Sequence, residues 1–115
     1  MKVAVIGSRG LVINDLGKYL PPDTTEIVSG GAIGIDACAQ QYAREKSIPL
    51  KVFLPEYDKN GRNAPLKRNV QIIDYADTVV AFWDGISRGT KFVIENCRTK
   101  GKPITVFEIT RFENV

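Results

Sequence analysis

Glycine, hydroxyl and charged side chains gather in three short segments of this sequence. Residues 29–36 read SGGAIGID and hold three glycines in six residues, while residues 7–10 read GSRG and residues 84–90 read DGISRGT. Glycine lets backbone amides approach a ligand closely, and serine, threonine and arginine supply hydrogen-bond donors. This composition is typical of loops that bind a phosphate or another anion.

Each segment follows an apolar run that is typical of a buried strand and precedes a predicted helix. Strands are predicted at residues 2–7, 25–30, 50–55, 78–83 and 104–109. Helices are predicted at residues 11–20, 33–47, 65–75 and 88–101, with a polar loop at residues 56–64. This alternation predicts an α/β fold, a Rossmann-like doubly wound parallel sheet of about five strands in order 3-2-1-4-5 with helices on both faces. We expect one domain over residues 1–115, the common size of a single domain.

The predicted strand order places the three segments together. The order reverses between the first and fourth strands, and ligands of such sheets bind there, outside the carboxyl ends of the strands. Each segment also opens a helix, whose free amides and positive dipole end favour an anion, so we predict a phosphate cradle. The alternative is that these residues serve tight turns, with Ser8 as a helix N-cap and Asp36 complementing a helix dipole.

A fourth feature is the sequence APLKRN at residues 64–69, which places Lys67, Arg68 and Asn69 in the first turns of a helix. A cation there opposes the helix dipole, which indicates another role for it. Arg68 would extend across the cleft and bind a phosphate through the several N–H donors of its guanidinium. The alternative is that these residues form a solvated basic face. We predict that Trp83 belongs to the core and that Glu95 faces solvent.

Several common kinds of site are excluded or disfavoured by what the sequence lacks. It has no histidine, which removes the usual general base and the usual zinc ligand, and we predict no metal site among its residues. GGAIG differs from G-x-G-x-x-G, and no G-K-[ST] occurs, so NAD-binding and P-loop assignments are disfavoured. The net charge of +3 is too small to identify a nucleic-acid-binding protein by itself.

The sequence also bears on location. It has no apolar run of about 18 residues and no signal-peptide cleavage pattern, so we predict a cytoplasmic protein without a membrane partner. Cys38 and Cys97 fall on apolar faces of predicted helices, and we expect buried free thiols rather than a disulfide.

Taken together and in this order, the segments resemble the SLOG superfamily of Rossmann-like domains, most closely its small single-domain YspA-like branch. The resemblance covers nearly the whole chain and rests on GSR after the first strand, SGGAIGID after the second, RN before the fourth and WDGISRGT after it. It implies a site for a nucleotide or a nucleotide-derived ligand. Magnesium is a candidate ion that would bind together with this ligand. The site residues so implied are Gly7, Ser8, Arg9, Ser29, Gly30, Gly31, Ala32, Gly34, Asp36, Arg68, Asn69, Asp84, Ser87, Gly89 and Thr90.

The superfamily includes the Lonely Guy phosphoribohydrolases, which cleave the N-glycosidic bond of nucleoside monophosphates and are similar over the loop P-G-G-x-G-T-x-x-E. Val93 stands where their catalytic glutamate belongs, and Glu95, two places later, is turned by about 200° around the helix. Arg68 matches the catalytic arginine of that family, but an arginine alone cannot do acid–base chemistry at neutral pH. The catalytic residue therefore stays unknown, and a different hydrolysis would depend on Asp36 or Asp84.

The leading prediction is a sensor or carrier of a small nucleotide ligand, and whether it also hydrolyses that ligand stays open. DNA-processing proteins of the superfamily share the SGGAIGID element, and this resemblance raises single-stranded DNA binding as the alternative. Such binding needs a basic groove with stacking aromatic side chains. The candidates for it near the predicted cleft are Arg62, Lys67, Arg68, Arg88, Lys91, Tyr57 and Trp83. Related families also form homodimers, and the resemblance implies the same here.

Overall fold

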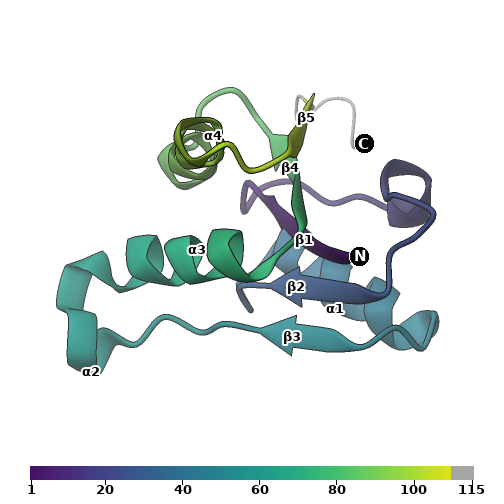
Figure 1. Cartoon of the computed structure of the whole chain (residues 1–115), viewed down its shortest axis with the longest axis horizontal. Helices are drawn as coiled ribbons and strands as arrows, with labels where there is room; N and C mark the ends of the chain where they lie inside the picture. Colours follow the sequence, from purple (N-terminus) through teal and green to yellow (C-terminus); the bar gives the residue numbers. More distant parts are fainter. Residues whose placement is uncertain (110–115) are drawn as a thin grey trace.

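The computed structural model describes residues 1–109, whose centre is a parallel sheet of five strands. The strands are β1 (Lys2–Gly7), β2 (Glu26–Ser29), β3 (Leu50–Val52), β4 (Thr78–Trp83) and β5 (Ile104–Glu108). Every neighbouring pair is parallel, and the order across the sheet is β3-β2-β1-β4-β5 (Figure 1). The predicted α/β class and strand order are confirmed, and the reversal lies between β1 and β4.

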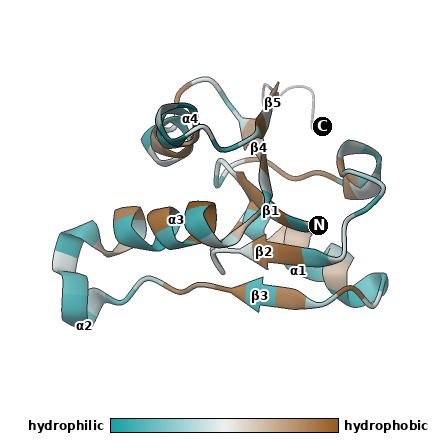
Figure 2. Cartoon of the chain, viewed as in Figure 1, coloured by the Kyte–Doolittle hydropathy of each residue, from teal (hydrophilic) through white to brown (hydrophobic). Residues whose placement is uncertain are grey.

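Helices cover both faces of the sheet. They are α1 (Ile35–Glu45), α2 (Tyr57–Asn60), α3 (Ala64–Tyr75) and α4 (Arg88–Lys100), with 3-10 turns η1 (Leu16–Tyr19) and η2 (Gly61–Asn63). Side chains of β1 alternate between two apolar layers, as a strand requires. Val3 and Val5 pack in the layer that contains α1 and η1, whereas Ala4 and Ile6 pack in the layer that contains α3 and α4. In Figure 2 the strands are mostly brown, α3 alternates between brown and teal, and the short α2 is largely teal.

The predicted helix at residues 11–20 is wrong, because only the turn η1 is helical in this segment. Leu11 and Leu16 are fully or almost fully buried, so their spacing reflects a loop that fills the core beside α1 rather than a helical period. Tyr19 then packs edge-on against Phe82 and Phe107, with ring centroids 5.2 and 4.9 Å away. These aromatic contacts fix the connection from β1 to β2 against the sheet.

The polar loop predicted at residues 56–64 is also corrected, since it contains α2 and η2. Neither element buries a residue, so no apolar period marked them in the sequence. The third strand is shorter than predicted and ends at Val52. Strand β4 has the predicted bounds, and α4 ends at the left-handed Gly101 (φ 72°), as expected for a helix C-terminus.

Both cysteines are free thiols, as predicted. Cys97 is buried on α4, but Cys38 on α1 is only half-buried, which corrects the expectation that both are buried. Among the helices of residues 1–109, none has the length and apolar character that a membrane crossing requires.

Candidate functional site

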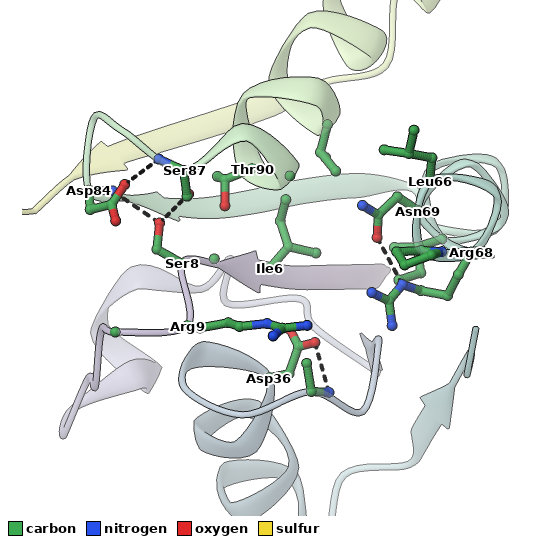
Figure 3. Close-up of a pocket in the computed structure, with 17 residues that line it drawn as sticks. Ile6, Ser8, Arg9, Asp36, Leu66, Arg68, Asn69, Asp84, Ser87 and Thr90 are labelled. Carbon is green, nitrogen blue, oxygen red and sulfur yellow. Dashed lines mark hydrogen bonds between the residues drawn. The ribbon is translucent and has the colours of Figure 1, made fainter. Parts of the chain in front are cut away.

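A cavity of about 340 Å³ lies where β1 and β4 end, at the reversal of the strand order. The loops after β1, β2 and β4 contribute to it, together with the first turns of α3 and α4 (Figure 3). Its lining residues are Ile6, Gly7, Ser8, Arg9, Gly10, Ala32, Asp36, Pro65, Leu66, Arg68, Asn69, Ile72, Asp84, Ser87, Gly89, Thr90 and Val93.

Most of the residues predicted for the site line this cavity. They are Gly7, Ser8, Arg9, Ala32, Asp36, Arg68, Asn69, Asp84, Ser87, Gly89 and Thr90. The structure thus brings together side chains from four segments that span more than half of the sequence. The other four predicted residues are not part of the lining: Ser29, Gly30, Gly31 and Gly34.

The glycines of the β2–α1 loop make room for other parts of the wall. A Cβ atom on Gly30 would lie 2.7 Å from Nη1 of Arg68, and one on Gly34 (φ +74°) would lie 2.4 Å from the carbonyl oxygen of Arg9. At Gly31 (φ +73°) the nearest atom would be Cδ2 of Leu54, 2.6 Å away. Gly30 and Gly34 therefore make room for the two arginines, and Gly31 makes room for Leu54.

Ser8 and Ser87 join the loops after β1 and β4. Their hydroxyl oxygens are 2.7 Å apart, and Ser8 Oγ also accepts from the amide of Asp84 at 3.2 Å. Asp84 Oδ1 in turn accepts from the amides of Ile86 and Ser87, at 2.9 and 2.8 Å. Slight burial raises the pKa of Asp84, but these amide bonds and the hydroxyls of Ser8 and Ser87 outweigh it and leave the pKa below its ordinary value. Asp84 is therefore an ionised group that shapes the turn before α4.

The N-terminus of α4 opens on the cavity. Ser87 precedes the helix, but its side chain does not cap it, because its hydroxyl bonds with Ser8. Thr90 is only 5% exposed, and its hydroxyl points into the cavity without a hydrogen-bond partner among residues 1–109 (Figure 3). A Cβ atom on Gly89 would meet nothing within 4 Å, so the space before the helix is open. Free first-turn amides, the helix dipole and the Thr90 hydroxyl together suit an anion.

Two arginines add positive charge. Arg68 donates from Nε to Asn69 Oδ1 at 2.9 Å and from Nη1 to the carbonyl oxygen of Gly30 at 2.6 Å. Both acceptors are neutral, and within residues 1–109 no carboxylate lies within 4.0 Å of Arg68 or Arg9. Burial lowers the pKa of Arg68 and the nearby Asp36 and Tyr57 oppose this, but a guanidinium stays charged in a protein.

Asp36, the second residue of α1, is the buried carboxylate of this site, with 7% of its surface exposed. Its Oδ2 accepts from the amide of Ala32 at 3.1 Å. Burial raises the pKa of Asp36, and the Ala32 hydrogen bond and the charges of Arg68 and Arg9 oppose the rise without cancelling it. A buried, perturbed carboxylate in a cavity is a candidate functional group.

The apolar part of the wall consists of Ile6, Pro65, Leu66, Ile72 and Val93, none of which was among the predicted ligand-binding residues. Gly10, the last residue of the predicted GSRG segment, also lines the cavity. Of the apolar residues, only Leu66 could have been identified from the sequence, because it is an apolar residue directly before the basic pair of the APLKRN segment. In the structure its side chain is 40% exposed.

Other predictions concern residues around the cavity. Trp83 donates to the carbonyl oxygen of Ser87 at 3.0 Å and is half-buried against the α3–α4 layer, so its predicted place in the core is confirmed only in part. Glu95 faces solvent as predicted, 3.8 Å from Lys91, whereas Val93 faces the cavity. The basic residues named for DNA binding lie outside the lining, apart from Arg68: Arg62, Lys67, Arg88 and Lys91 are exposed.

Comparison of the chain with protein-family models, curated proteins and solved structures gave no match.

Proposed function

We propose that the cavity binds a nucleotide or a nucleotide-derived ligand through its phosphate, and that the protein acts as a sensor or carrier of that ligand. The main support is the pair of arginines, Arg9 and Arg68, which reach one cavity from different walls and have no ionic partner within 4.0 Å among residues 1–109. Arginine binds phosphate with paired, charge-assisted hydrogen bonds. The open N-terminus of α4, with the free hydroxyl of Thr90, is the second group suited to phosphate oxygens.

The rest of the wall suits the remaining parts of a nucleotide. Pro65, Leu66 and Val93 form an apolar surface on the α3–α4 side, against which a planar base would lie. The volume of about 340 Å³ is at the small end of the range for ligand pockets, so we expect a mononucleotide rather than a dinucleotide.

We also propose that the chain belongs to the SLOG superfamily. Support comes from the sheet order 3-2-1-4-5 and from the motifs, since GSR, SGGAIGID and WDGISRGT lie at the ends of β1, β2 and β4 and RN lies on α3. A fold of this class hosts many functions, so the site residues and not the fold support the proposed ligand.

Binding, rather than phosphoribohydrolase activity, is the function that the site supports. The position of the catalytic glutamate in Lonely Guy enzymes is Val93 here, an apolar residue that is 2% exposed in the cavity wall. Glu95 is exposed and points elsewhere. Since a hydrocarbon side chain can neither accept nor donate a proton, that reaction lacks its acid–base group.

A thermal-shift panel tests the proposal. It contains nucleoside mono-, di- and triphosphates, cyclic nucleotides, ADP-ribose and a short single-stranded DNA, each with and without magnesium. A ligand at about 100 times its Kd stabilises the folded state by about 2.7 kcal/mol, which raises the Tm of a domain of this size by about 10 °C. We expect such a shift with a small nucleotide, and a loss of affinity of at least about tenfold for Arg68→Ala.

Lys67→Ala is the matched control, because Lys67 is the exposed neighbour of Arg68 and lies outside the cavity lining. A panel without any shift, or a nucleotide shift that Arg68→Ala leaves unchanged, would contradict the proposal. A shift only with DNA, falling steeply as salt rises, would favour the single-stranded DNA alternative.

A further inference from the structure

Asp36 is the only buried carboxylate among residues 1–109. It extends from the first turn of α1 into the cavity, with the guanidinium of Arg9 beside it (Figure 3). The proposed phosphate contacts do not use this group, because an ionised carboxylate has no proton to donate and repels an anion. Its presence in a phosphate-binding cavity therefore calls for a different partner.

One of the two carboxylate oxygens of Asp36 has no hydrogen bond within residues 1–109. Oδ2 accepts from the amide of Ala32, but no donor within residues 1–109 bonds to Oδ1. Oδ1 of Asp36 is also not fully buried. In the described chain, Asn96 Oδ1 is the only fully buried side-chain polar atom without a hydrogen-bond partner, so Oδ1 of Asp36, which also has no partner, must be accessible. In a cavity-lining residue that is 7% exposed, the remaining access of this oxygen is through the cavity.

A hydrogen-bond donor on a ligand in the cavity would complete this carboxylate. Arg9 and Arg68 lie near enough to lower its pKa, but neither forms an ion pair with it within 4.0 Å. A nucleotide offers donors on its sugar hydroxyls and on its base. The apolar surface suited to the base comes from α3 and α4, on the opposite face of the sheet from α1, which leaves the sugar hydroxyls for Asp36.

Resting on the proposed function, we propose that Asp36 accepts a hydrogen bond from a ribose hydroxyl of the bound nucleotide and thereby selects ribonucleotides over their deoxyribose counterparts. The phosphate then lies toward Thr90 and the arginines, and the sugar lies over the end of β1. A site built to bond a hydroxyl rejects an analogue that lacks it, because the buried acceptor is left unpaired.

The test compares the affinities of ribonucleoside, 2′-deoxyribonucleoside and 3′-deoxyribonucleoside 5′-monophosphates with the same base, measured by calorimetric titration for each of the four bases. For the unmodified protein we expect the ribonucleotide to bind at least about tenfold more tightly than one of the two deoxy analogues, the usual effect of a lost hydrogen bond to a charged group. Asp36→Asn keeps the shape and an acceptor for Ala32 but loses the charge, and we expect the preference to fall below about threefold. The control Asp74→Asn removes an exposed carboxylate at the far end of α3 and should retain the full preference.

The outcomes separate the two proposals. If ribose and both deoxyribose nucleotides bind equally to the unmodified protein, nucleotide binding stands and the role of Asp36 is wrong. The same conclusion follows if Asp36→Asn keeps the full preference. If no nucleotide binds, the proposed function itself is wrong, and the selectivity proposed for Asp36 is overturned with it.

Discussion

Asp36, Arg9 and Arg68 form a group of charges in the wall of the cavity. The two cations attract an anion, while the carboxylate lies near them without neutralising either through an ion pair in the described chain. Burial works against both signs of charge, raising the pKa of Asp36 and lowering that of Arg68. Charges kept apart in this way are typical of sites that bind ligands rather than of sites that stabilise a fold.

The raised pKa of Asp36 predicts how stability depends on pH. Between the ordinary value of 3.8 and the raised value, the folded state binds more protons than the unfolded state. The free energy of unfolding therefore falls as pH rises through this window, and the ionised carboxylate costs stability at neutral pH. We expect Asp36→Asn to raise the Tm at pH 7, and the gain to shrink as the pH approaches 3.8.

Thermal unfolding followed by circular dichroism between pH 3.5 and 8 measures this effect. Asp74→Asn is the control, since an exposed carboxylate should change stability by less than about 0.5 kcal/mol. A lower Tm for Asp36→Asn at pH 7 would show that attraction to the arginines outweighs the cost of burial.

At the level of single residues, the sequence indicated the polar residues of the site but not the apolar ones. Arg68 stands out because a cation at a helix start opposes the helix dipole, and Thr90 because DGISRGT places hydroxyls, an arginine and a glycine at a helix start. Ile6 and Ile72 could not be recognised, because a residue that lines a cavity and a residue in the core have the same apolar character in a sequence. The glycines of SGGAIGID were predicted to contact the ligand, but Gly30, Gly31 and Gly34 lie outside the cavity lining. The groups for which they make room could not be inferred without the fold.

The elements that matter most for the site are the loops after β1 and β2, which pack directly on each other. Gly34 lets the backbone of the β2–α1 loop approach the carbonyl of Arg9, and Gly7 lets the end of β1 approach Ile35 and the carbonyl of Phe82. The position of Arg9 thus depends on a contact between two backbones rather than on its own side chain.

Gly34→Ala tests this contact, with Gly61→Ala as the matched control. The two glycines have similar backbone angles, φ 74° and ψ −124° against φ 58° and ψ −133°. An added Cβ would meet the Arg9 carbonyl oxygen at 2.4 Å in the first case and nothing within 4 Å in the second. Both variants should lose about 1–3 kcal/mol through backbone strain, and Gly34→Ala should lose about 1–2 kcal/mol more through steric contact.

Urea denaturation of the two variants gives the comparison, and nucleotide titration should show weaker binding for Gly34→Ala alone. Equal losses of stability and equal affinities would mean that the β2–α1 loop yields without moving Arg9.

At the level of elements, periodicity predicted most of the fold. β4 is buried along nearly its whole length and has the predicted bounds. In an alternating α/β sequence, a continuous apolar run between polar segments indicates a buried parallel strand. The helix predicted at residues 11–20 was wrong, because leucines of a loop that packs into the core can have the same spacing as leucines on a helix. α2 was not predicted, because it has no buried residue and therefore no apolar period in the sequence.

For the whole molecule, strand order is the property that creates the site. The polar segments after β1, β2 and β4 are far apart in the chain, and only a reversal between β1 and β4 brings them to one cavity. This part of the prediction followed from topology rules, which hold for parallel sheets with right-handed crossovers. The identity of the ligand does not follow from topology, because it depends on the shape and polarity of the assembled wall.

The central claim is that a nucleotide binds in this cavity, and amide chemical shifts test it most directly. A 15N-labelled sample is titrated with an equimolar mixture of the four ribonucleoside 5′-monophosphates, with the Arg68→Ala variant in parallel. The predicted result is that the largest shifts fall on amides of the cavity wall, led by Ser8, Ala32, Gly89 and Thr90, and become much smaller in the variant. Shifts that cluster at the opposite end of the sheet, around Lys2 and Asp77, or the absence of any saturable shift, would contradict it.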